Sequence, residues 1–155
     1  MQRAMLAVVL VMLMIPQVTG AQNQQFEGTW KADVKKSKYE PGAAPKNETL
    51  RFEPVGDGFK LSLDGVNQQG PYHSEATGKF DGVDVPVLAT PARQAQFTYS
   101  FSRIDDRTWD IVIKVNGQRR IVVHNVVSED GKTMRGVSTV VPRNQVNQDV
   151  IYERQ

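Results

Sequence analysis

Residues 96–127 read QFTYSFSRIDDRTWDIVIKVNGQRRIVVHNVV, and this stretch decides the fold class. Apolar side chains recur at every second position in its three segments, a period typical of half-buried β-strands and not of helices. Asp105-Asp106 separates the first two segments, and Asn116-Gly117 separates the second from the third. Asn-Gly between two alternating segments is a strong signal for a tight hairpin. The stretch therefore predicts three consecutive antiparallel strands.

The same alternation continues through almost all of the chain after residue 25. We expect strands at 26–34, 47–53, 59–64, 72–80, 83–88, 96–104, 108–115, 119–127, 133–141 and 149–153. Asp57-Gly58 supplies the backbone angles for the turn between the second and third of these strands. Loops are expected at 89–94 and 142–147. Residues 35–46 contain two prolines and a glycine, which oppose a helix and favour a crossing or lid loop.

About nine or ten short strands joined mostly by tight turns predict an all-β fold. The best match is an up-and-down antiparallel β-barrel of about 8–10 strands, because closing the sheet leaves no free edge. A two-sheet sandwich is the alternative, although its Greek-key crossings need longer connections than most of those in this chain.

The first 21 residues have the composition of a secretory signal peptide. Arg3 precedes a continuous apolar run at 4–15, and small residues follow at 19–21. The alternative is a membrane anchor, but a span needs about 20 apolar residues. We therefore expect cleavage after Ala21, a single domain at 22–155, no stable membrane span after cleavage, and a periplasmic or extracellular location.

Charge and cysteine content limit the classes of partner. The formal net charge is +2, and it falls to +1 without the expected signal peptide, because Arg3 is the only charged residue there. Such a balance favours neither nucleic acid nor an anionic membrane surface as a partner. The chain has no cysteine, so it has no acylation site for a lipoprotein anchor and no disulfides. The hydrophobic core must hold the fold.

Gly28-Thr29-Trp30 resembles the Gly-x-Trp signature in the first strand of lipocalins and other calycins. In that group the tryptophan closes one end of the barrel, and an arginine from a late strand packs across its ring. The resemblance implies this structural role for Gly28, Trp30 and Arg154, with Arg135 as the alternative arginine. A guanidinium over an indole contributes about 0.5–2 kcal/mol.

The resemblance extends to small exported bacterial lipocalin-like proteins and covers nearly all of residues 26–154. The segments that carry it are GTWKADVKKSKYEPGAAPK, EPVGDGFK, RIDDRTWDI and SEDGKTM. The chain departs from the pattern at Ala32-Asp33, where Leu-Asn is common. This resemblance implies an architecture rather than an activity.

One aromatic face is a candidate binding surface for a small apolar or amphipathic molecule. Barrels of eight or more strands hold either side chains or a small ligand, so these residues line a cavity or form a plain core. Tyr99 is a possible polar contact for a ligand, and Arg119 a possible carboxylate partner, although a solvated charge beside a turn is the simpler interpretation of Arg119. The candidate residues are Phe59, Leu61, Phe97, Tyr99, Phe101, Trp109 and Arg119.

Catalytic and metal-binding signals are weak. His73 and Glu75 lie two apart on one predicted strand, so they share a face and could act as a base with an orienting carboxylate. His124 is the other histidine, and no spacing brings the two together as metal ligands. The chain has no Gly-x-Ser-x-Gly motif and no glycine-rich phosphate loop before a helix. We expect no metal and no cofactor.

Three functions fit the sequence. The first is an exported protein that binds a small apolar or amphipathic molecule inside the barrel. The second is an envelope or interaction protein with a solid barrel that acts through its loops at 35–46 and 142–148. The third is a barrel enzyme that uses His73 with Glu75, or His124.

Overall fold

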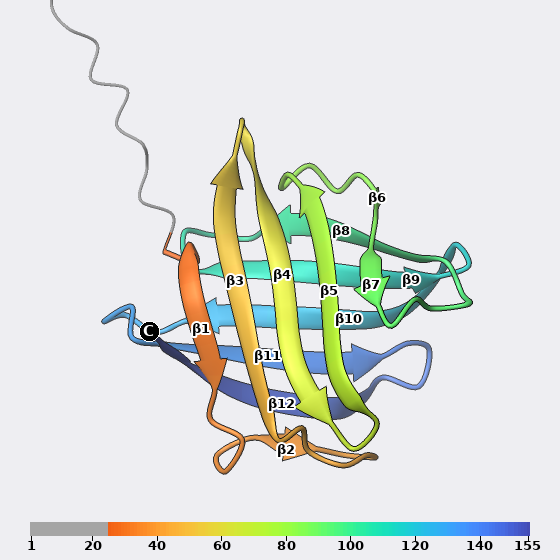
Figure 1. The fold of residues 1–155 in the computed structure, drawn as a ribbon. Helices are drawn as coiled ribbons and strands as arrows, with labels where there is room; N and C mark the ends of the chain where they lie inside the picture. Colours follow the sequence, from red (N-terminus) through yellow and green to blue (C-terminus); the bar gives the residue numbers. More distant parts are fainter. Residues whose placement is uncertain (1–24) are drawn as a thin grey trace, which may run out of the picture.

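Twelve antiparallel strands form one sheet that curls into a nearly closed barrel (Figure 1). The computed structural model describes residues 25–155, so the signal peptide expected at 1–21 lies outside the described residues. The strands are β1 (Gly28–Ala32), β2 (Lys38–Tyr39), β3 (Asn47–Val55), β4 (Gly58–Asn67), β5 (Gly70–Gly78), β6 (Val85–Pro86), β7 (Leu88–Thr90), β8 (Phe97–Arg103), β9 (Thr108–Val115), β10 (Gln118–Val127), β11 (Thr133–Val140) and β12 (Gln145–Arg154). Across this part of the chain, no helix is long and apolar enough to span a membrane.

The strand order confirms the up-and-down barrel. Strands β8 to β12 are neighbours in sequence order, and β1 then joins β12 to the β3–β4–β5 meander. The two ends of the sheet are β6, which pairs with β8, and β7, which pairs with β5. Only Val87 separates β6 from β7, so together they act as one bent strand that bridges the last gap. With the nine longer strands, this bent strand makes ten around the barrel.

Strand pairing corrects three predicted loops. Strand β7 extends into the first two residues of the loop expected at 89–94, where it pairs with β5. Strand β12 starts inside the loop expected at 142–147, where its first residues pair with β11. The loop expected at 35–46 contains β2, which pairs with β12. In each case a neighbouring strand supplies partners that local composition does not reveal.

Two hairpin turns show how far turn chemistry can be predicted. Asn116 and Gly117 have φ of 50° and 77°, which are the positive angles expected of an Asn-Gly hairpin. The β3–β4 turn is one residue earlier than expected. Val55 pairs with Gly58, so Gly56-Asp57 forms the turn, and Gly56 carries the positive φ of 58°.

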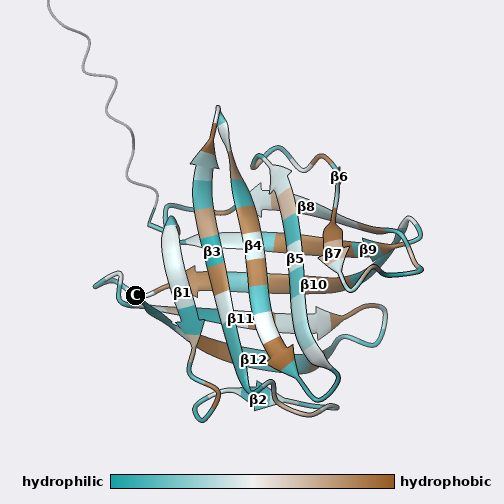
Figure 2. Ribbon diagram, viewed as in Figure 1, coloured by the Kyte–Doolittle hydropathy of each residue, from teal (hydrophilic) through white to brown (hydrophobic). Residues whose placement is uncertain are grey.

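One end of the barrel is filled with aromatic side chains. Phe26, just before β1, is 2% exposed and lies at the centre of the cluster. Four other rings have centroids 5.0–5.7 Å from that of Phe26: Phe52, Phe59, Phe80 and Trp109. Phe101 adds a further ring, 4.9 Å from Phe59. Apolar and polar residues alternate along the strands that carry these rings (Figure 2).

Trp30 and Arg154 close the same end of the barrel. Trp30 is fully buried, and its indole N–H donates to the Phe26 carbonyl at 2.7 Å. The Arg154 guanidinium lies 4.2 Å from the centroid of the Trp30 ring, and the two residues are paired between β1 and β12. Gly28 has φ of 117°, and a Cβ there would lie 3.2 Å from the Arg154 guanidinium. Arg135, the alternative arginine, is instead paired with Asp149.

Candidate functional site

Beyond the aromatic end, the interior of the barrel is hollow. A cavity of about 150 Å³ lies between the two halves of the sheet. Small inward residues leave the space open, notably Ser74 on β5 and Gly136 and Ser138 on β11. Half of the sixteen residues that line it are aliphatic: Leu50, Leu61, Leu63, Ile111, Ile113, Ile121, Val123 and Val150.

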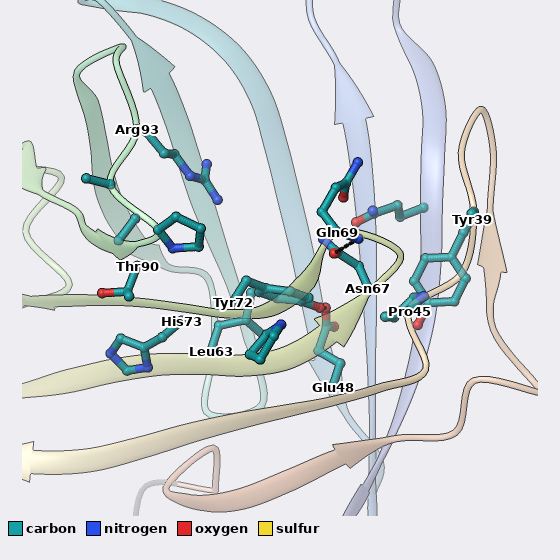
Figure 3. A pocket seen from close by; sticks show the side chains of 16 residues that line it. Tyr39, Pro45, Glu48, Leu63, Asn67, Gln69, Tyr72, His73, Thr90 and Arg93 are labelled. Carbon is teal, nitrogen blue, oxygen red and sulfur yellow. Dashed lines mark hydrogen bonds between the residues drawn. The ribbon is translucent and has the colours of Figure 1, made fainter.

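A second, wider cavity of about 530 Å³ lies at the open end of the barrel (Figure 3). Most of its wall comes from three separate segments: residues 39–48, the hairpin at 67–73, and the connection at 89–93. Glu48, Leu63 and Gln148 line both cavities. The two cavities are therefore adjacent, and these three side chains form the junction between them.

Glu48 is the central polar group at this junction. It is half-buried on β3, and one carboxylate oxygen accepts a hydrogen bond from the Tyr72 hydroxyl at 2.7 Å. The other oxygen accepts one from the Tyr152 hydroxyl, also at 2.7 Å. Tyr72 belongs to β5 and Tyr152 to β12, on opposite sides of β3 in the sheet. These two hydrogen bonds connect the Glu48 carboxylate to strands on both sides of β3 and hold its position.

All four tyrosines of the chain line these two cavities. Tyr39 and Tyr72 lie in the outer cavity, and Tyr99 and Tyr152 lie in the inner one. Burial, followed by the negative charge of Glu48, raises the pKa of Tyr39, Tyr72 and Tyr152. Burial also raises the pKa of Tyr99. The tyrosines therefore stay protonated and can donate hydrogen bonds to Glu48 or to a bound molecule.

A glycine on β4 makes room for Tyr72. Gly65 is paired with Tyr72 across the β4–β5 ladder, and a Cβ at Gly65 would overlap the Tyr72 ring. The ring thus lies directly over the glycine backbone. This contact holds the Tyr72 hydroxyl toward Glu48, so an interior glycine in β4 contributes to the geometry of the site.

The residues predicted to bind a ligand divide into three groups. Leu61 and Tyr99 line the inner cavity. Phe59, Phe101 and Trp109 belong to the aromatic cluster at the closed end. The remaining two lie apart: the Phe97 ring is covered by the Arg93 guanidinium at 4.5 Å, and Arg119 is exposed beside the β9–β10 turn.

The two histidines form separate pairs with carboxylates. His73 Nδ1 lies 2.7 Å from Asp64, and its Nε2 lies 3.6 Å from Glu75. His73 also borders the outer cavity. His124 Nδ1 lies 2.7 Å from Asp110 on the neighbouring β9, and the His124 side chain is exposed. Within residues 25–155, no group of three or more His, Cys, Asp or Glu side chains is placed to hold a metal ion.

The two predicted contact loops lie side by side. Lys38 and Tyr39 pair with Asp149 and Gln148, so the segment at 35–46 lies against the start of β12. The Tyr39 side chain reaches the outer cavity from this segment. The lid expected at 35–46 therefore borders the open end of the barrel.

Sequence reasoning missed Glu48, Tyr39, Tyr72 and Tyr152 as site residues. A signal for Glu48 was present: in the segment at 47–53 it has the same parity as Leu50 and Phe52, so it lies on the apolar face. A charged residue on the core-facing side of a strand is uncommon and indicates a function or a specific partner. The tyrosine contacts are made between strands distant in sequence, and no local pattern reveals them.

No family model matches the chain, and no curated protein is significantly similar to it.

Proposed function

We propose that this protein binds a small amphipathic molecule inside the barrel. The supporting observation is an inner cavity that lies next to a wider outer cavity, with Glu48, Leu63 and Gln148 lining both. Binding sites of this kind are concave and mostly apolar, with a few placed polar groups. The aliphatic wall would take the apolar part of the molecule, and Glu48 with the tyrosines would contact its polar part.

The two alternative functions have less support. An interaction protein acting only through its loops calls for a solid barrel, whereas this interior is hollow beside β11. A barrel enzyme would need a histidine at the cavity with a ring nitrogen available to a substrate. His73 borders the outer cavity, but both of its ring nitrogens lie within 3.6 Å of a carboxylate, and His124 is exposed on the barrel wall.

Export and family membership are part of the same proposal. The apolar run at 4–15 supports secretion into the periplasm or outside the cell. The Gly28-Thr29-Trp30 segment and the guanidinium of Arg154 over the Trp30 ring support a place among the small exported lipocalin-like proteins. A binding protein in such a compartment would carry or sequester a molecule that is poorly soluble in water.

A dye-uptake experiment tests the binding proposal. The neutral dye N-phenyl-1-naphthylamine becomes fluorescent in apolar surroundings, and wild-type protein is expected to take it up saturably. Ser138→Phe places a ring in the cavity of about 150 Å³ and should reduce uptake strongly. Ser102→Phe is the matched control, because Ser102 is exposed on β8.

Circular dichroism should show that both variants keep the all-β fold. Saturable uptake that Ser138→Phe removes and Ser102→Phe retains supports binding in the cavity. Absence of uptake by the wild type, or equal uptake by all three proteins, contradicts the proposal.

A further inference from the structure

The Glu48 carboxylate at the cavity junction has no cationic partner within residues 25–155. Among residues 25–155 the hydrogen bonds to the Glu48 carboxylate come from two neutral tyrosine hydroxyls, and no cationic side chain forms an ion pair with it. Eight of the other sixteen Asp and Glu side chains form an ion pair with Lys or Arg. Glu53, on the same strand, pairs with Lys60, and Asp149 pairs with Arg135. Within the described part of the chain, Glu48 is therefore a half-buried negative charge without a cationic partner.

Three tyrosines lie near this charge. Tyr72 and Tyr152 contact the carboxylate directly, and the Tyr39 hydroxyl lies near enough for the Glu48 charge to raise the Tyr39 pKa. The Tyr39 hydroxyl is buried near Ser37 and makes no well-formed hydrogen bond within the described part of the chain. A carboxylate beside tyrosine hydroxyls can hold an organic ammonium group by charge and by hydrogen bonding.

We infer that the barrel selects an organic ammonium ion, with the cationic group at Glu48 and a compact apolar body in the inner cavity. This inference rests on the proposed function and adds the class of ligand. Each carboxylate oxygen of Glu48 accepts one hydrogen bond from a tyrosine hydroxyl. A carboxylate oxygen can accept two, so each still has one lone pair available. An ammonium N–H can use it and form a charge-assisted hydrogen bond, which is stronger than a neutral one.

Arg93 is the cationic side chain that lines the outer cavity, and it would favour an anionic ligand instead. It is exposed, however, and its guanidinium already lies 4.5 Å from the centroid of the Phe97 ring. An anion held at the junction would meet the negative charge of Glu48, which lines both cavities, whereas Arg93 lines only the outer one. Glu48 lies deeper than Arg93 and is held by two hydrogen bonds. Its negative charge therefore favours a cationic ligand.

A series of ligands with one tail and three head groups tests the inference. Hexylamine, 1-hexanol and hexanoate are titrated into the full chain by calorimetry at pH 7, where a primary amine with a pKa near 10 is protonated. The wild type should bind hexylamine at least tenfold more tightly than 1-hexanol, and hexanoate most weakly. Glu48→Gln should remove this preference, so that hexylamine no longer binds more tightly than 1-hexanol. Glu53→Gln, which removes an outward charge from the same strand, should bind all three like the wild type.

The outcomes separate this inference from the proposed function. Equal binding of the three ligands by the wild type, or tightest binding of hexanoate, overturns the ammonium preference while the binding function stands. Unchanged selectivity in Glu48→Gln, with its fold intact by circular dichroism, also overturns it. If Glu48→Gln does not fold, the wild-type comparison decides alone. Failure of the wild type to bind any of the three, while N-phenyl-1-naphthylamine is taken up, overturns only the inference. Failure to bind the dye as well overturns both.

Discussion

Arg154 lies over the Trp30 ring, and its removal should destabilise the barrel far more than the removal of most exposed side chains. Arg154 donates to the carbonyl of Gly131 at 2.7 Å, to that of Glu27 at 2.7 Å, and to that of Gln25. It also lies over the Trp30 ring. Two of the carbonyls belong to the segment that carries Phe26 into the aromatic cluster, so one side chain fixes the start of the described chain to its last strand.

The magnitude follows from these contacts. A net intramolecular hydrogen bond contributes about 0.5–1.5 kcal/mol, and an exposed cation–π contact about 0.5–1 kcal/mol. Three such bonds and one stacking contact, counted near the lower values because the side chain is exposed, predict that Arg154→Ala lowers the free energy of unfolding by about 2–4 kcal/mol. Arg154→Lys should recover less than half of this loss, because an ammonium cannot stack and reach three carbonyls together.

Urea unfolding followed by far-UV circular dichroism measures the change, provided that the slopes of the transitions agree. Arg135→Ala is the matched control. It removes an arginine from the neighbouring strand whose exposed pair with Asp149 should contribute at most about 1 kcal/mol. If Arg154→Ala costs no more than Arg135→Ala, the interpretation of Arg154 as the closing residue of the barrel is refuted.

Three further predictions follow from the closed end and the site. Phe26→Ala should lower the free energy of unfolding by about 3–5 kcal/mol, because it leaves a cavity among four rings; a loss below about 1 kcal/mol in urea would contradict the packing. Gly65→Ala should displace the Tyr72 ring and cost about 1–3 kcal/mol, more than Tyr72→Phe, which removes only the hydroxyl; equal stability of Gly65→Ala and wild type would contradict the contact. The raised pKa values of all four tyrosines mean that the unfolded chain loses phenolic protons near pH 10 while the folded chain keeps them. The tyrosine contribution to stability is therefore complete below about pH 10 and lost as the pH rises further. Phenolate absorbance at 295 nm should accordingly rise only together with the loss of circular dichroism, and a tyrosine that titrates near pH 10 in folded protein would contradict the burial.

The fold was predictable because the strands are long and the period is regular. Apolar alternation and short turns identify nine of the ten strands around the barrel, and the Asn116-Gly117 turn has the backbone angles that its composition implies. Errors occur where pairing, not local composition, decides the structure. Strand β2 is two residues in a segment interrupted by prolines, and it forms because β12 offers partners. The bent β6–β7 strand divides its pairs between β8 and β5.

The site was harder to predict because it depends on which residues face inward and which small ones leave space. The aromatic residues predicted as ligand contacts largely fill the closed end, since large rings at neighbouring inward positions pack on one another. The hollow comes from small inward residues such as Gly136 and Ser138, which carry no signal in a periodicity pattern. Glu48 was visible as a charge on an apolar face, but its tyrosine partners are 24 and 104 residues away.

Native mass spectrometry of protein secreted by an exporting host tests the central claim most directly. The claim is that the barrel carries a small molecule in its hollow interior. We predict a native mass above that of the chain, an excess that disappears on denaturation, and a basic amphipathic compound in the organic extract. A bare native mass, unchanged after incubation with N-phenyl-1-naphthylamine or hexylamine, would contradict the account.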